Sequence, residues 1–291
     1  MRSGVVACRG ITLFLLVIQD TANTDSLQKI WRNRKLIIVP TEHWANLKKE
    51  LKDAPTFVYS ILDLVIEGTV YADSTKYHSL LFQKASGLYF VTGDATNESF
   101  QKSIASIYEK SVFQGKRFTL FSSEDTWNKS IEQYLVNKLR KVERYAFSFD
   151  LLKYNTRKRI DLKNYDVLKI NPNLIEHCLE FNKNYYEEYW DSVDNFLKNG
   201  IGFCVKDKEK IISEGVSIFK SERYAEIDIT TDSNYRGKGL ASIVAELFID
   251  YCLSKNIQPR WDCDINNGSS IKLASKLGFY NPLKYAVYGV K

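Results

Sequence analysis

The segment Asn234-Tyr-Arg-Gly-Lys-Gly-Leu240 places two glycines one residue apart, between an expected strand and an expected helix. Glycines in this spacing let backbone N–H groups close on an anion without obstruction by Cβ atoms, and a helix that begins there adds its partial positive charge. Arg236 and Lys238 contribute formal positive charge. The segment predicts a phosphate-binding turn, with an ordinary strand-to-helix turn as the alternative. The predicted anion-binding residues are Arg236, Gly237, Lys238, Gly239, Leu240 and Ala241.

A second informative segment follows one expected helix and one expected strand later. It runs Trp261-Asp-Cys-Asp-Ile-Asn-Asn-Gly-Ser-Ser-Ile-Lys-Leu-Ala-Ser-Lys-Leu-Gly-Phe279. In this order, the two segments resemble the acyl-CoA-binding core of the GNAT acetyltransferase superfamily. More narrowly, Ile227–Asp232, the glycine turn and Trp261–Cys263 resemble a two-domain bacterial branch that includes relatives of the zwittermicin-resistance acetyltransferases. The resemblance covers the final two-fifths of the chain well and the first half loosely.

The resemblance implies an N-acetyltransferase that uses acetyl-CoA as cosubstrate and acetylates a small-molecule amine by direct attack on the thioester. It also implies the GNAT fold, an α/β (α+β) architecture with a mixed, largely antiparallel central sheet flanked by helices. In such a fold, the strand end formed by Ile229, Thr230 and Thr231 pairs its backbone with the pantetheine arm. Asn267 is placed to hydrogen-bond the same arm, and Ser270 either assists there or caps the following helix.

Two carboxylates precede the glycine turn. In a strand from Tyr224 to Thr231, Glu226 and Asp228 share one face. Burying such groups is costly without a purpose, and partial burial raises a carboxyl pKa toward a value suited to taking a proton from an ammonium group. We predict Glu226 as the general base and Asp228 as its partner or as an anchor for the acceptor. The alternative is structural pairing of both with Arg223 or Arg260.

Two positions depart from the family pattern. The tyrosine that protonates the departing thiolate in many members is replaced by Ala274, and the first position of the phosphate motif, often Gln or Arg, is Asn234. Backbone groups carry most of the phosphate contacts, so Asn234 weakens the motif little, whereas Ala274 leaves the general acid unidentified. A catalytically silent CoA-binding sensor or scaffold is therefore the alternative to an enzyme. A dinucleotide-binding oxidoreductase is disfavoured, because the full Gly-x-Gly-x-x-Gly pattern is missing.

Aromatic and acidic side chains gather in Tyr185-Tyr-Glu-Glu-Tyr-Trp190 and at the nearby Asp191 and Asp194. Aromatic walls with anionic groups suit a cationic or aminated small molecule. Amphipathic helices often have the same composition, with the aromatic residues in the core and the carboxylates in solvent. Both interpretations remain open at this point, and the acceptor itself is not identified by the sequence.

The elements that must position these residues follow from hydrophobic periodicity. Before residue 150, we expect apolar strand or helix fragments at 36–39 and 57–62, strands at 87–92, 118–121 and 145–149, and helices at 98–109 and 123–138. After residue 164, we expect a strand at 165–170, a helix from Pro172 to Trp190 and a short helix at 193–198. Strands at 202–205, 211–219 and 224–231, a helix at 238–254, a strand at 260–264, a helix at 269–277 and a strand at 284–290 complete the pattern.

The 291 residues suggest two domains, and 44% hydrophobic with 26% charged residues is typical of a globular protein. We expect an N-terminal extension at 1–23, an N-terminal α/β domain at 24–152, a basic linker at 153–163 and the GNAT domain at 164–291. The first domain shows no catalytic constellation, and the resemblance suggests a degenerate copy of the same fold.

Net charge, cysteine content and hydropathy limit the kinds of partner that we expect for this protein. The chain has a net charge of +6, and its basic residues are interspersed with acidic ones. A polyanionic cofactor accounts for this charge, so no nucleic-acid partner is expected. Five scattered cysteines indicate reduced thiols and a cytoplasmic protein, without metal-ligand spacing. The apolar run at 11–18 is too short to span a bilayer, so no membrane partner is expected. The oligomeric state is not predicted.

Overall fold

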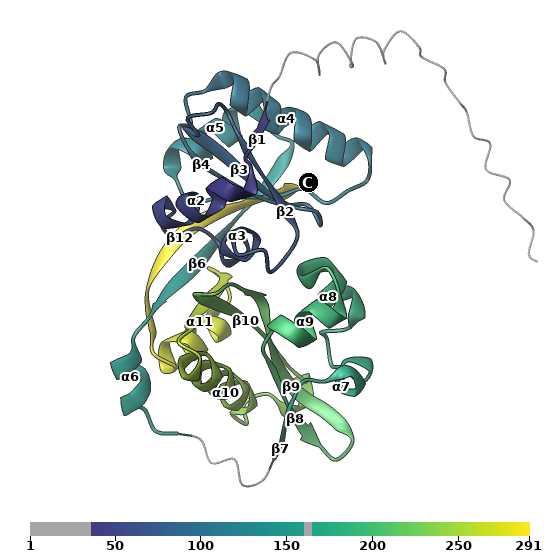
Figure 1. The fold of residues 1–291 in the computed structure, drawn as a ribbon. Helices are drawn as coiled ribbons and strands as arrows, with labels where there is room; N and C mark the ends of the chain where they lie inside the picture. Colours follow the sequence, from purple (N-terminus) through teal and green to yellow (C-terminus); the bar gives the residue numbers. More distant parts are fainter. Residues whose placement is uncertain (1–35, 160–164) are drawn as a thin grey trace, which may run out of the picture. The chain divides into compact units, whose positions relative to one another are not determined.

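The computed structural model describes residues 36–159 and 165–291 (Figure 1). The expected extension at 1–23 and residues 160–163 of the expected linker lie outside the described residues. Residues Leu36–Lys291 form one compact unit. Among the described residues, no helix has the length and apolar character that a membrane span requires.

Twelve strands form one sheet in the described part of the chain. Its order is β1-β2-β3-β4-β5-β12-β6-β11-β10-β9-β8-β7, with the bounds given below. Neighbouring strands are antiparallel except for the pairs β4–β5 and β10–β11, which are parallel. The expected mixed, largely antiparallel sheet is confirmed. The strands are β1 (Ile37–Ile38), β2 (Gly68–Ala72), β3 (Ser79–Lys84), β4 (Leu88–Gly93), β5 (Thr119–Ser122), β6 (Leu139–Phe149), β7 (Asp166–Lys169), β8 (Gly202–Asp207), β9 (Lys210–Lys220), β10 (Tyr224–Thr231), β11 (Gln258–Asp264) and β12 (Phe279–Val290).

Helices cover both faces of this sheet. The α-helices are α2 (Trp44–Glu50), α3 (Thr56–Leu62), α4 (Glu98–Phe113), α5 (Asp125–Tyr134), α6 (Leu151–Thr156), α7 (Pro172–Glu176), α8 (Lys183–Trp190), α9 (Val193–Asn199), α10 (Leu240–Ser254) and α11 (Gly268–Lys276). Short 3-10 helices lie at η1 (Thr41–His43) and η2 (Ser233–Tyr235). In the second half of the chain, α10 and α11 pack on the face of β10 and β11 that carries Ala225 and Trp261. The opposite face meets α3 and α8.

The single helix expected from Pro172 to Trp190 is wrong, because the chain forms α7 and α8 with a break between them. The carboxylate of Glu214 on β9 accepts hydrogen bonds from the amides of Glu180 (2.6 Å) and Phe181 (2.9 Å). Asn182 then caps α8 through its side chain, which accepts from the Tyr185 amide at 3.3 Å. A tertiary contact from a distant strand therefore overrides the helical periodicity of this segment.

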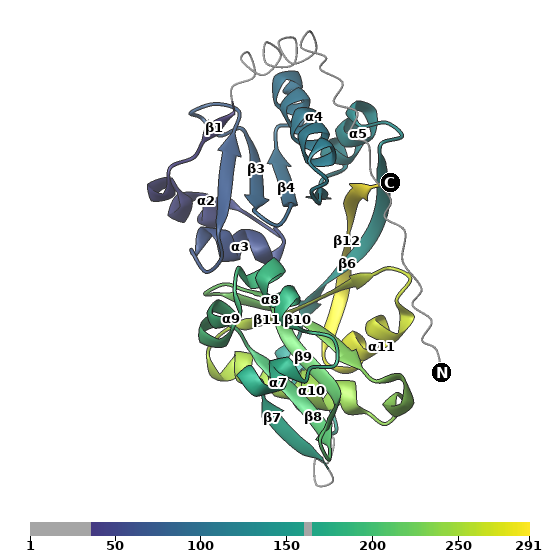
Figure 2. The ribbon, with the colours of Figure 1, turned by 90° about the vertical axis from the view of Figure 1, so that its right-hand side faces the viewer.

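The same order of elements occurs twice. The first half contains β2-β3-β4, helix α4, β5, helix α5 and β6, and the second half contains β8-β9-β10, helix α10, β11, helix α11 and β12. In each half, a helix connects two parallel strands. The last strands are exchanged, since β12 pairs with β5 of the first half and β6 pairs with β11 of the second. Figure 2 shows β6 and β12 running side by side between the halves. The sheet thus continues across the expected domain boundary, and the division at 153–163 stays a prediction.

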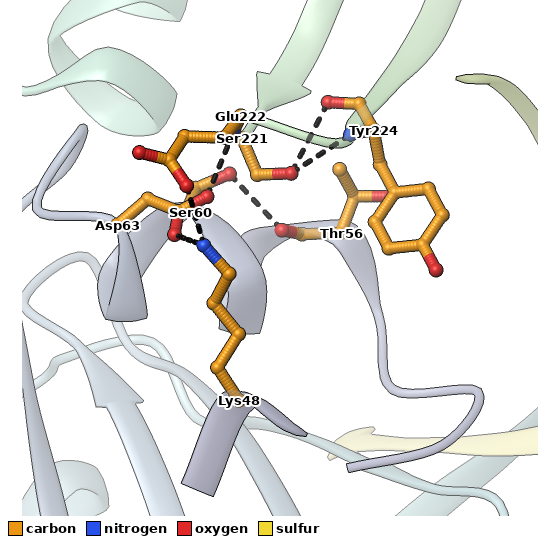
Figure 3. A network of polar contacts seen from close by, with 7 residues as sticks. All are labelled: Lys48, Thr56, Ser60, Asp63, Ser221, Glu222 and Tyr224. Atoms are coloured by element: carbon orange, nitrogen blue, oxygen red, sulfur yellow. Dashed lines mark hydrogen bonds and ion pairs between the residues drawn. The ribbon is translucent and has the colours of Figure 1, made fainter. Parts of the chain in front are cut away.

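Helix α3 of the first half is attached to the turn between β9 and β10 of the second half (Figure 3). Lys48 on α2 forms ion pairs with Asp63 at the end of α3 and with Glu222 in the turn. The second carboxylate oxygen of Asp63 accepts from the Glu222 amide at 2.7 Å. Aromatic contact reinforces the attachment, because the rings of Tyr59 and Tyr224 lie 5.0 Å apart. The second part of α3 is consequently held against the turn between β9 and β10.

Candidate functional site

The glycine turn joins the end of β10 to the start of α10. Gly237 and Gly239 have φ angles of +77° and +83°, which L side chains rarely adopt. Within the described residues, none of the amides from 236 to 242 donates a hydrogen bond, and the first that does is that of Ile243, to the Gly239 carbonyl at 3.1 Å. A row of unpartnered N–H groups at a helix N-terminus is the geometry that binds phosphate.

These amides border a cavity of about 780 Å³, called here the turn cavity. Lys238 is the one predicted anion-binding residue that does not line it, and its ammonium lies 4.6 Å over the ring of Tyr235. The guanidinium of Arg236 lines the cavity and donates to the Thr231 carbonyl at 3.3 Å. The predicted residues that line the turn cavity are Ile229, Thr230, Thr231, Arg236, Gly237, Gly239, Leu240, Ala241, Asn267 and Ser270.

The turn cavity opens where two parallel strands separate. The pairing of β10 with β11 comprises three residues on each strand and ends at Glu226 and Arg260. On its other side, β10 stays paired with β9 as far as Thr231. Residues 227–231 therefore present an unpaired strand edge, which offers backbone N–H and C=O groups to an extended ligand.

The equivalent turn of the first half, between β4 and α4, has no such cradle. The Asp94 amide donates to the His78 carbonyl (2.8 Å), the Thr96 amide to the Asp94 carboxylate (2.8 Å) and the Phe100 amide to the Asn97 side chain (3.1 Å). Asp94 also places a negative charge where an anion would bind. Of the two repeats, only the second therefore has a glycine turn with a row of unpartnered amides within the described residues.

Asn267 and Ser270 lie on the opposite wall of the turn cavity, at the start of α11. The Asn267 side chain caps α11 by accepting from the Ser270 amide at 3.0 Å, and its amide nitrogen points to no acceptor within the described residues. The Ser270 hydroxyl does not cap the helix; it accepts from the Trp261 indole at 2.9 Å. The capping role that the sequence offered for Ser270 thus belongs to Asn267.

The predicted catalytic carboxylates lie on the shared face of β10. Asp228 lines the turn cavity, where its carboxylate accepts from the Tyr185 hydroxyl (3.0 Å) and the Ile229 amide (2.9 Å). Burial raises the pKa of Asp228 despite these hydrogen bonds. Burial also raises the pKa of Glu226, against the opposing positive charges of Arg144 and Arg260. Both carboxyls are thereby shifted toward the range of a general base at neutral pH.

Within the described residues, no direct ion pair joins these carboxylates to Arg223 or Arg260, although the charge of Arg260 opposes the rise in the pKa of Glu226. The guanidinium of Arg260 donates to the Ala54 carbonyl at 2.7 Å and lies 3.7 Å from the centre of the Tyr224 ring. Arg223 lies 5.0 Å from the same ring. The ion pairs of the described residues include neither arginine.

Glu226 lines a second cavity of about 620 Å³, called here the central cavity. Residues from both halves form it, since the start of α3 and strand β5 face β10, β11 and β12 across it. Its walls combine aromatic rings with a few charged groups, which is typical of a small-molecule site. The aromatic lining residues are Phe57, Phe90, Phe121, Phe147, Tyr189, Phe219, Trp261 and Tyr285.

Within the aromatic segment 185–190, some residues agree with the packing interpretation and others with the acceptor interpretation. Tyr186 and Trp190 are buried in the core, as the packing interpretation requires. Tyr189 lines the central cavity, as the acceptor interpretation requires. Asp191 forms an ion pair with the buried Lys84 of the first half, so it is a structural residue.

Sequence reasoning missed a cluster centred on Asp262 of β11. The Arg144 guanidinium on β6 donates to Oδ1 of Asp262 at 2.7 Å, and the Tyr285 hydroxyl on β12 donates to Oδ2 at 2.7 Å. Burial, followed by the charge of Glu226, raises the pKa of Asp262 to about 7. Alternation along the strand expected from Arg260 to Asp264 could have indicated that Asp262 shares a face with both of these residues. No local signal connects it with Arg144 and Tyr285, which reach it only through the exchanged strands.

Ala274, at the position of the usual tyrosine, is fully buried on the inner side of α11 and presents no polar group. Cys178, Cys204, Cys252 and Cys263 are free thiols. The described residues contain no cluster of His, Cys, Asp or Glu that could hold a metal ion. Any proton donor to the product must accordingly come from another residue or from water.

Comparison with known proteins gives a consistent result. The family model described as GNAT acetyltransferase matches residues 45–288. The uncharacterized N-acetyltransferase YdfB of Bacillus subtilis (strain 168) is 45% identical over 249 residues, which cover 84% of this chain and 95% of that protein. A GCN5-related N-acetyltransferase-like protein from Streptococcus suis 89/1591 has a TM-score of 0.63 at 25% identity, covering 86% of this chain and 99% of that one. A GNAT-family acetyltransferase from Colwellia psychrerythraea shares the fold, with a TM-score of 0.51 at 12% identity and coverage of 88% and 100%.

Proposed function

The chain belongs to the GNAT acetyltransferase family and is an N-acetyltransferase; from this premise we propose that it transfers an acetyl group from acetyl-CoA to the amine of a small molecule. The donor assignment depends on one observation, the row of unpartnered amides from 236 to 242 beside the turn cavity. These amides and Arg236 bind the diphosphate of CoA. The two positive φ angles at Gly237 and Gly239 are typical of turns whose successive amides bind an anion.

The unpaired edge of β10 receives the pantetheine arm. An extended, amide-containing ligand can add to this edge as a strand would, using the backbone groups of Ile229, Thr230 and Thr231. The side chain of Asn267 faces this arm from the opposite wall, and Ser270 orients Trp261 beside it. The thioester then lies where β10 and β11 separate.

The central cavity receives the amine, with Glu226 as the general base and Asp228 as its partner. The raised pKa of Glu226 suits it to accept a proton from an ammonium group, directly or through water. The free amine attacks the thioester carbonyl, and the thiol of CoA leaves. We place the reaction in the cytoplasm, where acetyl-CoA is available.

Two measurements test this function. Calorimetric titration of CoA into the protein is expected to show binding, and no binding at millimolar CoA would remove the donor assignment. A thiol-release screen with acetyl-CoA against polyamines, amino acids and aminated antibiotics is expected to identify at least one acceptor. CoA binding without thiol release from any amine would instead support the sensor alternative, which the buried Ala274 motivates.

A further inference from the structure

The turn cavity and the central cavity share part of their walls. Arg144, Trp261 and Asp262 line both of them. On the proposed function, the thioester enters from the turn cavity and the amine from the central cavity, so the reacting atoms meet at this shared wall. The other carboxylates line a single cavity: Asp228 and Asp264 the turn cavity, and Asp53, Glu124 and Glu226 the central cavity. Asp262 is thus the one described carboxylate that faces both reactants.

Strand register explains how Asp262 reaches this position. On β6, the residue paired with Asp262 is Ala146, which lies two residues from Arg144. Arg144 is in turn paired with Tyr285 on β12. Residues two apart on a strand share a face, so all three functional side chains point to the same side of the sheet. On the other neighbour, β10, Glu226 is paired with Arg260, two residues before Asp262. The face that carries Asp262 is therefore the face that carries the predicted base.

Two donors fix the orientation of the Asp262 carboxylate. Arg144 Nε contacts Oδ1 and the Tyr285 hydroxyl contacts Oδ2, while Arg144 Nε also lies 3.1 Å from the Tyr285 oxygen. A carboxylate oxygen accepts two hydrogen bonds, so each oxygen keeps one position for another partner. Burial and the adjacent Asp262 charge raise the pKa of Tyr285, so its hydroxyl keeps its proton and remains a donor. The hydrogen bonds from Arg144 and Tyr285, called here the Asp262 clamp, therefore leave Asp262 able to accept or give a proton.

We propose that Asp262 carries a proton from the acceptor nitrogen to the sulfur of the departing thiol, an inference that rests on the proposed function. Glu226 first removes one proton from the ammonium group. As the amine forms its bond with the carbonyl carbon, the nitrogen becomes positively charged, and the Asp262 carboxylate takes an N–H proton. When the C–S bond breaks and its electron pair moves to sulfur, Asp262 returns this proton to sulfur. Amide and free thiol are the products, and the carboxylate is restored.

The charges around the Asp262 clamp suit Asp262 to transfer a proton. The groups that face Asp262 are Glu226 from β10, Arg144 from β6 and Tyr285 from β12. Burial and Glu226 raise its pKa, Arg144 and Tyr285 oppose the rise, and the resulting value of about 7 makes both protonation states accessible at neutral pH. Asp262 would thereby supply the acid that the family's tyrosine supplies elsewhere and that Ala274 cannot.

The first test is Asp262→Asn, assayed by thiol release from acetyl-CoA with the amine that the wild-type protein acetylates fastest in the screen. We expect kcat to fall by about 10²–10³-fold, with CoA affinity unchanged in calorimetry. The rise of kcat with pH near 7 should also disappear. Asp250→Asn is the matched control, because Asp250 likewise accepts from a tyrosine, Tyr154 (2.7 Å), and pairs with an arginine, Arg159, but lines neither cavity. Its kcat and pH profile should equal those of the wild type.

A second variant keeps the proposal testable if Asp262→Asn fails to fold. Tyr285→Phe removes one donor from the carboxylate, which raises the pKa of Asp262, so the rising limb of kcat should move to higher pH. An unmoved pH profile in a folded Tyr285→Phe variant, or an unchanged pH profile and kcat in Asp262→Asn, would overturn the shuttle and leave the proposed function intact. Absence of thiol release by the wild-type protein with every amine would overturn the acetyltransfer and the shuttle together.

Discussion

Gly237→Ala isolates the contribution of the proposed phosphate-binding turn, because the chain contains a matched glycine elsewhere. Gly237 has φ of +77° and Gly115, in the loop after α4, has φ of +62°. A Cβ added at either position meets no atom within 4 Å. Both substitutions therefore incur the same kind of backbone strain, about 1–2 kcal/mol for a left-handed non-glycine residue, without a steric clash.

The two variants should differ in ligand binding. In Gly237→Ala, the new methyl group is added to a residue that lines the turn cavity, and relaxation of the strained φ would turn the unpartnered amides away from the anion. A loss of about 1.4–3 kcal/mol corresponds to a ten- to hundredfold weaker Kd. Gly115→Ala should lose similar unfolding free energy but keep the wild-type Kd, since Gly115 lines neither cavity.

Calorimetry with CoA gives the two Kd values, and urea unfolding gives the two stabilities. Equal CoA affinity in Gly237→Ala and the wild type would refute the assignment of the turn as the diphosphate site. An equal loss of affinity in both variants would show that binding responds to global stability and not to the turn.

Two further predictions concern the base and the junction between the halves. Glu226→Gln should keep CoA affinity and lower turnover by about 10²-fold. Because the charge of Glu226 raises the pKa of Asp262, the rise of kcat near pH 7 should also move to lower pH. Unchanged pH-dependent rates would exclude Glu226 as the base. Asp191→Ala should destabilise the fold by about 3 kcal/mol, measured by urea unfolding, because it leaves Lys84, whose side chain is 1% exposed, without its counter-charge. Glu209→Ala is its control: Glu209 is 99% exposed beside Lys206, so its loss should be too small to resolve, and equal stability of the Asp191 variant would contradict the reasoning.

Local patterns predicted most of the second half of the fold, apart from the break between α7 and α8. The strand expected at 224–231 is β10, and the helices expected at 238–254 and 269–277 agree with α10 and α11 to within two residues. Alternation along β10 placed Glu226 and Asp228 on one face, and the glycine spacing located the turn with unpartnered amides. These features depend on residues that are adjacent in sequence, so periodicity and turn chemistry suffice to find them.

The first half was harder to predict. The segment 57–62 was ambiguous between strand and helix, since all seven residues of α3 are buried and neither alternation nor a helical stripe is visible. Strands β2 and β3 and helix α2 were not anticipated at all. The Asp262 cluster was equally hidden, because Arg144 and Tyr285 lie 118 and 23 residues from Asp262 and meet it only through strand pairing.

The exchange of last strands makes the first half part of the proposed catalytic site, even though the amides of its own β4–α4 turn already have hydrogen-bond partners. Without β6, Asp262 would lose Arg144, and without the pairing of β12 to β6, Tyr285 would not lie beside that arginine. The first half also contributes the start of α3 to the wall of the central cavity. The repeat without unpartnered amides in its turn therefore still supplies groups to the proposed site of the other repeat. On this reasoning, changes at β6 should affect turnover and its pH dependence, whereas changes in the β4–α4 turn should affect stability alone.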